Sequence, residues 1–216
     1  MSLSRTVPII ACALALVPAA APNTLQQSVA KARAGCATVK RPAARTEARK
    51  PPKQALDPGK RYDVTLQTNC GSFTIRLDVR HSPHTTASFA ALARSHFFDR
   101  TIFHRIVPGF VIQGGDPTQT GGGGPGYSTV DRPPASTRYT EYTVAMAKTQ
   151  TEPAGTSGSQ FFVVTGPGVQ LPPDYAFLGK VYVGRKVVDA IGKLGDQQTE
   201  QPTRVIEIER ASVRVS

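Results

Sequence analysis

The stretch from Phe103 to Asp116 places one arginine, Arg105, among large apolar residues. A buried charge without a partner is costly, so an arginine in such surroundings has either a structural ion pair or a chemical task. A fixed guanidinium can stabilise a lone pair or a charge that exists only in a transition state. Such chemistry needs neither a base that takes a proton nor a covalent intermediate. The ion pair and the catalytic donor are therefore the two interpretations of Arg105.

Other residues whose types could catalyse a reaction or bind a ligand do not match the known motifs for such sites. His104 and Ser159 are types found in hydrolases, but no nucleophile elbow or orienting acid accompanies them. The histidines and cysteines have no metal-ligand spacing, so we expect no metal. Gly121–Gly126 formally contains G-x-G-x-x-G, yet no helix opens after it and no P-loop lysine follows. We expect a flexible loop there, and no cofactor.

Eight short strands and two helices are predicted to position these residues. Tyr62–Leu66 and Phe73–Leu77 alternate as half-buried strands do. Ser82 and Pro83 mark the first helix, as its N-cap and first turn. The other elements are expected as strands at 101–107, 110–113, 142–147, 160–165, 177–183 and 205–215, and a helix at 186–194. This order predicts an all-β dominated fold, a closed eight-stranded antiparallel β-barrel with a capping helix over each mouth.

The formal net charge of +11 is concentrated before the predicted barrel. Residues 22–61 contain ten Lys and Arg against two acidic residues, whereas residues 62–216 contain fifteen against thirteen. The near-neutral domain argues against a nucleic-acid partner. We divide the chain into a signal at 1–21, a basic Ala/Lys/Arg/Pro-rich tail and linker at 22–60, and a domain at 61–216. The tail is predicted to be a solvated spacer; weak contact with an anionic membrane or cell wall is the alternative.

Residues 1–21 have the layout of an export signal. Arg5 precedes a short apolar stretch, Val7–Val17, and small residues follow. The stretch is shorter than the ~20 apolar residues that a transmembrane helix needs. Cys12 follows Ile-Ile-Ala, so a lipoprotein signal is the alternative to a signal peptide. We expect an exported protein, either secreted or anchored to the envelope.

Cys36 and Cys70 remain when Cys12 is assigned to the signal. In an oxidising compartment an isolated pair of cysteines usually closes into a disulfide. In a reducing cytosol both would stay thiols. A bridge would pin the tail to the edge of the domain.

Three motifs at consistent spacing extend over about residues 62–215. They are Phe103–Asp116, Val144–Ala147 continuing to Gly158–Val163, and Leu171 with Phe177–Val181. In these motifs the chain closely resembles the cyclophilins. The resemblance implies a cyclophilin-like barrel and a peptidyl-prolyl cis/trans isomerase that acts on proline-containing polypeptides. The closed barrel gives no reason to expect a dimer, so we expect a monomer.

Rotation about an Xaa-Pro bond must break amide resonance, against a barrier of ~18–20 kcal/mol. As the bond twists, the amide nitrogen gains a lone pair, which the guanidinium of Arg105 can bind only in the transition state. By resemblance, Arg105, Phe110 and Gln113 are catalytic, with Gln113 orienting Arg105 and binding the peptide backbone. The substrate-binding residues implied by the resemblance are Val111, Ala147, Lys148, Gln160, Phe162, Leu171 and Tyr175. Among them, Ala147 and Lys148 would present main chain to the substrate.

Five positions depart from the pattern of animal cyclophilins. Gln170 replaces a tryptophan beside the slot, and Lys148 replaces an asparagine on the substrate-binding strand. Three pocket residues also differ: Tyr175 replaces a histidine, Leu178 a phenylalanine and Val111 a methionine. These changes remain compatible with a slot for proline. They predict weak sensitivity to cyclosporin.

An exported isomerase would assist the folding of secreted proteins, whose slow steps include Xaa-Pro isomerisation. One alternative is a non-catalytic module that binds proline peptides in the same groove. Another is an envelope scaffold in which the basic tail is the functional part. The presence of Arg105, Phe110, Gln113 and Phe162 favours the enzyme, because a binding module has no need of Arg105.

Overall fold

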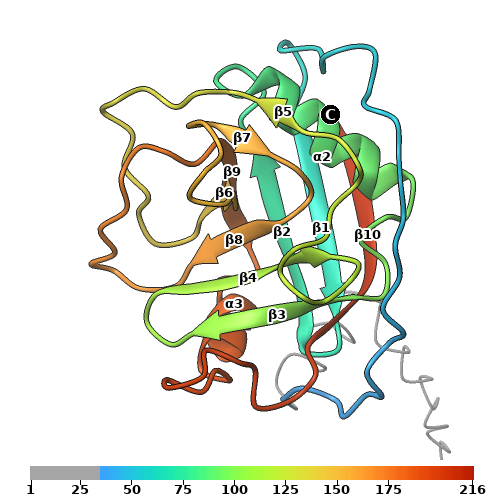
Figure 1. Ribbon diagram of the computed structural model, residues 1–216, viewed down its shortest axis with the longest axis vertical. Coiled ribbons are helices and arrows are strands. Elements are labelled where there is room, and N and C mark those ends of the chain that lie inside the picture. Colours follow the sequence, from blue (N-terminus) through green and yellow to red (C-terminus); the bar gives the residue numbers. More distant parts are fainter. Residues whose placement is uncertain (1–34) are drawn as a thin grey trace, which may run out of the picture.

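The computed structural model describes residues 35–216 (Figure 1). The predicted signal at 1–21 and the tail residues 22–34 lie outside these described residues. Eight strands form the barrel: β1 (Tyr62–Thr68), β2 (Gly71–Leu77), β3 (Thr101–Val107), β4 (Val111–Asp116), β6 (Thr143–Met146), β8 (Phe161–Val164), β9 (Phe177–Val183) and β10 (Glu207–Val215). They close antiparallel in the order β1-β10-β3-β4-β8-β6-β9-β2, which confirms the predicted barrel.

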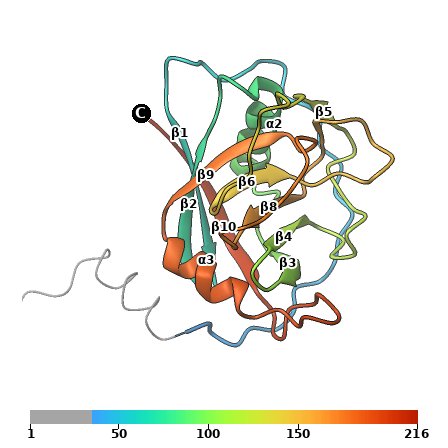
Figure 2. The ribbon, with the colours of Figure 1, turned by 90° about the vertical axis from the view of Figure 1, so that its left-hand side faces the viewer.

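Two helices, α2 (Pro83–Arg94) and α3 (Arg185–Gly192), lie at opposite ends of the barrel (Figures 1 and 2). Ser82 occupies the N-cap position of α2, as predicted, but its side chain makes no capping hydrogen bond. Instead, the carboxylate of Asp131 accepts the Thr85 N–H at 2.6 Å. This cap comes from a residue 46 positions further along the chain, which no local signal at the helix start reveals.

Asp131 follows a small second sheet that the sequence patterns did not predict. The sheet pairs β5 (Thr129–Val130) with β7 (Thr156–Ser157). Strands of two residues are too short to show alternation. The serine hydroxyl of Ser157 bonds the Thr129 and Thr85 hydroxyls at 2.9 and 3.2 Å, and so ties this sheet to α2.

The barrel core is built from phenylalanine rings packed edge to face. The Phe161 ring lies 5.4 Å from Phe89, 6.0 Å from Phe98 and 5.9 Å from Phe103, at interplanar angles near 90°. Side chains alternate along a strand, so Phe161 faces this core and its neighbour Phe162 faces outward. The packed core therefore fixes the outer face of β8.

Residues 35–60 form no helix or strand, but they run along the outside of the barrel (Figure 1). A disulfide joins Cys36 to Cys70 in the turn between β1 and β2. The Ala37 N–H donates to the Asn69 carbonyl at 2.8 Å, and the Arg45 side chain donates to the Phe97 carbonyl at 2.6 Å. The prediction of a solvated spacer is therefore wrong for this segment. The composition of this segment indicates that it cannot form a hydrophobic core of its own. It does not indicate whether the segment packs against another part of the chain.

Within residues 35–216, no helix has the length and apolar character needed to cross a membrane.

Candidate active site

The register of three neighbouring strands brings the main predicted site residues into one row. Arg105 on β3 pairs with Gln113 on β4, and Gln113 pairs with Phe162 on β8. The pairing of β3 with β4 shifts between Phe103 and Arg105. Such a bulge re-aims side chains, so Phe103 faces the core while Arg105 lines a pocket.

A chain of polar contacts links this row to a neighbouring loop. Arg105 Nη1 donates to Gln113 Oε1 at 3.4 Å, and Gln113 Nε2 donates to Gln160 Oε1 at 3.0 Å. Gln160 Nε2 then donates to the carbonyls of Gly121 and Gly123, at 2.8 and 3.0 Å. Each amide is thereby held in one orientation, and so is the guanidinium that they approach.

The Nε of Arg105 donates to Glu200 Oε2 at 2.6 Å. Glu200 stands in the loop before β10, and its carbonyl accepts the Ile106 N–H at 2.8 Å. The two interpretations of Arg105 therefore hold together, since the residue has an ion-pair partner and also lines the pocket. Sequence analysis did not identify Glu200, which is 95 positions away from Arg105.

A cavity of about 340 Å³ contains most of the predicted site. It is lined by Arg105, Phe110, Val111, Gln113, Ala147, Lys148, Phe162, Leu171 and Tyr175, together with Gln150, which was not predicted. Gln160 lies apart from these, in an adjoining cavity of about 170 Å³. The two cavities share Gln113, Ala147 and Lys148. Together they form a groove. The larger cavity, the slot, contains the aromatic and large aliphatic side chains, and the smaller one, which we name the polar cavity, is lined mainly by glycines and polar residues.

The apolar wall of the slot is fixed from behind by Tyr139. The ring of Tyr175 lies 5.3 Å from that of Phe162, edge to face. The Tyr139 hydroxyl donates to the Tyr175 carbonyl at 2.5 Å and accepts the Tyr175 N–H at 3.1 Å. Burial raises the pKa of Tyr139 to about 12, so this hydroxyl keeps its proton at neutral pH.

Lys148 closes the other side of the slot with a side chain that is only 5% exposed. Its Nζ pairs with Asp174 at 2.7 Å and donates to the Glu152 carbonyl at 3.0 Å. It also lies 5.9 Å from the centre of the Tyr175 ring. The lysine thus clamps the loop after β6 to the segment that carries Tyr175. The Ala147 N–H is bonded to the Gln160 carbonyl at 2.9 Å, so this donor does not face a substrate.

Two positions compared with animal cyclophilins lie outside the slot. Leu178 is fully buried in the barrel core, so its description as a pocket residue is wrong. Gln170 is exposed and lines neither cavity.

The ring nitrogens of His104, next to Arg105, are buried, and the ring lies against Gly121 of the glycine-rich loop. Neither ring nitrogen has a hydrogen-bond partner among the described residues. Burial lowers its pKa, because the charged ring would lose its hydration. Within residues 35–216, no three His, Cys, Asp or Glu gather closely enough to hold a metal ion.

Comparison with known proteins matches the chain to one family. The family model described as "Cyclophilin type peptidyl-prolyl cis-trans isomerase/CLD" matches residues 63–213. The chain is 36% identical over 168 residues to peptidyl-prolyl cis-trans isomerase A of Mycobacterium tuberculosis, covering 69% of this chain and 91% of that protein. It is 38% identical over 169 residues to isomerase B of Streptomyces anulatus, covering 69% and 95%.

A crystal structure of a Cryptosporidium parvum cyclophilin type isomerase, determined in the presence of the dipeptide Ala-Pro, is also similar. Its TM-score is 0.65 at 31% identity, and the match covers 70% of this chain and 98% of that one. The chain described here is therefore a peptidyl-prolyl cis-trans isomerase and belongs to the cyclophilin family.

Proposed function

We propose that the 340 Å³ cavity holds the proline ring of an Xaa-Pro segment and that Arg105 is the catalytic donor. Phe110, Phe162, Leu171 and Tyr175 provide apolar surface for the ring. Glu200 and Gln113 hold the guanidinium beside that surface. When the amide twists, its nitrogen gains a lone pair within reach of a donor that is already in place.

The observation that carries this proposal is the register row from Arg105 through Gln113 to Phe162. It places a cation and an apolar slot side by side on a rigid barrel. A ground-state amide nitrogen has no free lone pair, so the donor bonds the transition state in preference to the substrate. Because this stabilisation needs only a donor held in place, the reaction requires no base or nucleophile.

The test is isomerisation of a short Xaa-Pro peptide by the full chain, with Arg105→Lys and Arg105→Ala beside the wild type. Lysine keeps the charge but loses the planar fork of donors. We expect both variants to lose at least about 100-fold in kcat/KM, a size usual for one transition-state donor. A lysine variant with wild-type activity would contradict the role of Arg105.

We also propose that the isomerase is exported and assists the folding of exported proteins. The layout of residues 1–21 and the Cys36–Cys70 disulfide support this, because structural disulfides persist in oxidising compartments. Fractionation of cells that express the full chain tests it. Retention of the protein in the cytosol with both cysteines as thiols would contradict it.

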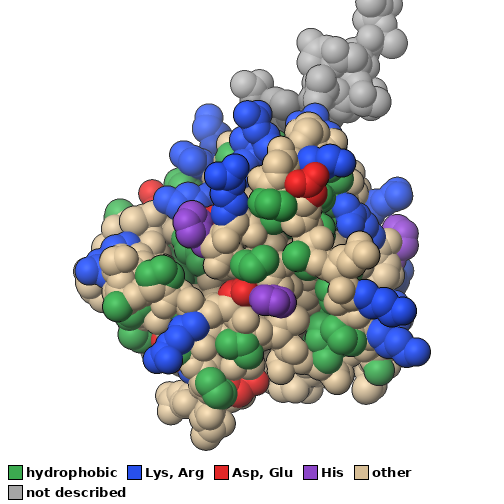
Figure 3. Space-filling model, turned by 90° about the horizontal axis from the view of Figure 1, so that it is seen from above, with side chains coloured by type: hydrophobic (Ala, Val, Ile, Leu, Met, Phe, Trp, Pro, Cys, Tyr) green, Lys and Arg blue, Asp and Glu red, His purple; other side chains and the backbone are tan. Residues whose placement is uncertain are grey.

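Weak contact with anionic lipid or cell-wall polymer is proposed for the basic segment before the barrel. Lys40, Arg41 and Lys50 are exposed on it. Lys and Arg also outnumber acidic side chains on the face seen in Figure 3. Binding to anionic vesicles should weaken as salt rises, and salt-independent binding would contradict it. We propose that the chain acts as a monomer without nucleic acid.

A further inference from the structure

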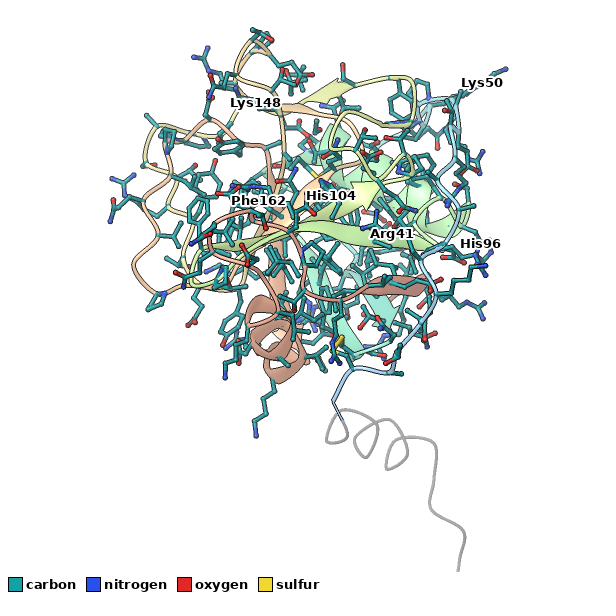
Figure 4. The ribbon with its side chains drawn as sticks, turned by 60° about the horizontal axis from the view of Figure 1, so that its bottom comes forward. Arg41, Lys50, His96, His104, Lys148 and Phe162 are labelled. Carbon is teal, nitrogen blue, oxygen red and sulfur yellow. A yellow bond between two sulfur atoms is a disulfide. The ribbon has the colours of Figure 1, made fainter. Side chains whose placement is uncertain are left out.

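The segment that precedes the family domain contacts the loop that forms one wall of the substrate groove. We name residues 36–50 the strap and residues 117–126 the glycine loop. The family match begins at residue 63, so the strap lies outside it. Figure 4 shows strap residues Arg41 and Lys50 at one side of the molecule, with Lys148 and Phe162 across His104 from them.

Three hydrogen bonds join the strap to the glycine loop. The Arg45 N–H donates to the Pro117 carbonyl at 2.9 Å, and the Arg49 N–H donates to the Pro125 carbonyl at 2.8 Å. Between them, Gln119 Nε2 donates to the carbonyl of the buried Pro42 at 2.9 Å. The strap therefore holds the loop at both ends and at Gln119.

The backbone of the glycine loop is permissive, and two sets of contacts order it. The buried Asp116 carboxylate accepts the N–H groups of Thr118, Thr120, Gly121 and Gly123 from inside, and the strap bonds the loop from outside. Glycine loses more conformational freedom on ordering than any other residue, and this loop has five. Gln119 is held at a φ of 62°, a left-handed conformation that a residue with a side chain adopts only when its surroundings fix it. The bond from Gln119 to Pro42 is one of the contacts that fix it.

On its inner side, the loop belongs to the groove. Gly121, Gly122 and Gly123 line the 170 Å³ cavity. The Gly121 and Gly123 carbonyls hold the amide of Gln160, which in turn holds Gln113. Contacts therefore run without a break from the strap through the glycine loop to the residues beside Arg105.

Both ends of the segment that contains the strap are fixed to the barrel. The Cys36–Cys70 disulfide fixes the first end, and Arg61, whose N–H donates to the Ser216 carbonyl at 2.9 Å, fixes the second. Without the disulfide the first end would be held by hydrogen bonds alone, such as those between Ala37 and Asn69. These bonds and the bonds to the glycine loop would then have to order a more mobile segment, which opposes their formation.

We propose that the strap is a positioning element of the substrate groove, held in place by the Cys36–Cys70 disulfide. It orders the glycine loop and thereby the polar cavity beside the proline slot. The catalytic row consists of Arg105, Gln113 and Phe162. These residues lie on β3, β4 and β8, and the strap is part of none of these strands. The guanidinium of Arg105 is also held by Glu200, which lies outside both the strap and the glycine loop. Loss of the strap contacts therefore weakens the binding of peptides that extend into the polar cavity, while Glu200 keeps the donor in place and the chemical step unchanged. The inference rests on the proposed use of the groove for peptide binding.

The experiment compares the full chain with the double variant Cys36→Ser/Cys70→Ser and with Gln119→Ala. Thr46→Ala is the matched control, since Thr46 is exposed on the strap and no bond of its side chain is seen among the described residues. Two measurements are made on each: hydrogen exchange of the glycine-loop amides, and the kcat and KM for a long and a minimal Xaa-Pro peptide.

We expect exchange in the glycine loop to rise by at least about tenfold in both test variants, as local opening becomes easier. KM for the long peptide should rise about three- to tenfold with kcat unchanged, because uniform binding is lost. The minimal peptide, which does not reach the polar cavity, should show no change in KM. Thr46→Ala should match the wild type throughout.

Unchanged exchange in folded variants would overturn the inference, and so would faster exchange without any change in KM for the long peptide. If the double variant fails to fold, Gln119→Ala decides the question with the disulfide intact. Failure of the proposed function is seen separately. In that case Arg105→Lys keeps full activity, while the exchange measurement still reports on the strap.

Discussion

Arg105 and Glu200 form an ion pair with 2.6 Å between Nε and Oε2, although 95 positions separate them in the chain. Their side chains are 34% and 45% exposed. A pair with this exposure stabilises a fold by only about 0–1 kcal/mol. Its importance therefore lies in the orientation of the guanidinium. Glu200 can serve this purpose because its own backbone is bonded to Ile106, the neighbour of Arg105.

Replacement of Glu200 tests this orienting role. We expect Glu200→Ala to lower kcat about three- to tenfold with little change in KM, because a loose donor is less often in the reactive geometry. Glu200→Gln keeps an oxygen acceptor for Nε and should retain most of the activity. The measurement is peptide isomerisation, with kcat and KM separated. Equal kcat values for the alanine variant and the wild type would show that Glu200 has no part in catalysis.

Tyr139→Phe removes the hydroxyl that holds both main-chain groups of Tyr175. Leaving these groups unpaired should lower the free energy of unfolding by about 1–3 kcal/mol. KM should rise about threefold, because Tyr175 forms a wall of the slot. Tyr127→Phe is the control, since its hydroxyl bonds Ser88 away from the slot. The same rise in KM in both variants would point to a general loosening of the barrel.

Capping of α2 by Asp131 is tested by urea unfolding. Asp131→Ala removes the acceptor for the buried Thr85 N–H and should destabilise the protein by about 2 kcal/mol. Ser82→Ala should change stability by less than about 0.5 kcal/mol, because the Ser82 side chain makes no capping bond. A larger loss of stability in Ser82→Ala than in Asp131→Ala would show that Ser82 caps the helix.

The barrel was predictable from sequence because its information is local. Alternation in Tyr62–Leu66 and Phe73–Leu77 specifies strands with one buried face, and both strands are observed. The motif around Arg105 extends over β3 and β4, so its residues were expected on neighbouring strands, but the register shift between Phe103 and Arg105 has no signal in the sequence pattern.

The features that the sequence patterns did not predict depend on contacts between segments that are far apart in the chain. The cap from Asp131, the ion pair from Glu200 and the docking of the strap each join residues far apart in the chain. No periodicity records such a contact. The strap is the plainest example, because its charge and proline content are those of a spacer. Its docking is revealed by contacts with distant residues, which are the disulfide, side-chain bonds such as that of Arg45, and backbone bonds that every sequence can make.

Cyclosporin inhibition is expected to be weak. This chain has the exposed Gln170 where animal cyclophilins are expected to have a tryptophan beside the slot, and Tyr175 and Val111 change the slot itself. Loss of one large aromatic contact typically costs a ligand about 2 kcal/mol or more. Titration of isomerase activity with the drug measures this, and Gln170→Trp should tighten inhibition. Nanomolar inhibition of the wild type would contradict the expectation.

The buried His104 predicts a dependence of stability on pH. Burial lowers its pKa most; Asp116 acts in the opposite direction, and Arg105 lowers the pKa further. The unfolded chain, where the histidine pKa is about 6.5, therefore binds more protons than the folded chain in the range below that value. Stability from this group is complete above pH 6.5 and is lost as pH falls toward the lower folded pKa.

Urea unfolding between about pH 7.5 and 5 should thus show a decline below pH 6.5 that His104→Leu reduces. The other histidines, His81, His84 and His96, each contact an aspartate and remain in the variant as internal controls. Because both ring nitrogens of His104 are buried and the glycine loop lies against the ring, NMR titration should find this ring still neutral below pH 6.5, where a histidine of the unfolded chain takes up its proton. A ring that takes up its proton as an unfolded histidine does, and an unchanged slope in the variant, would show that water reaches His104 beneath the loop.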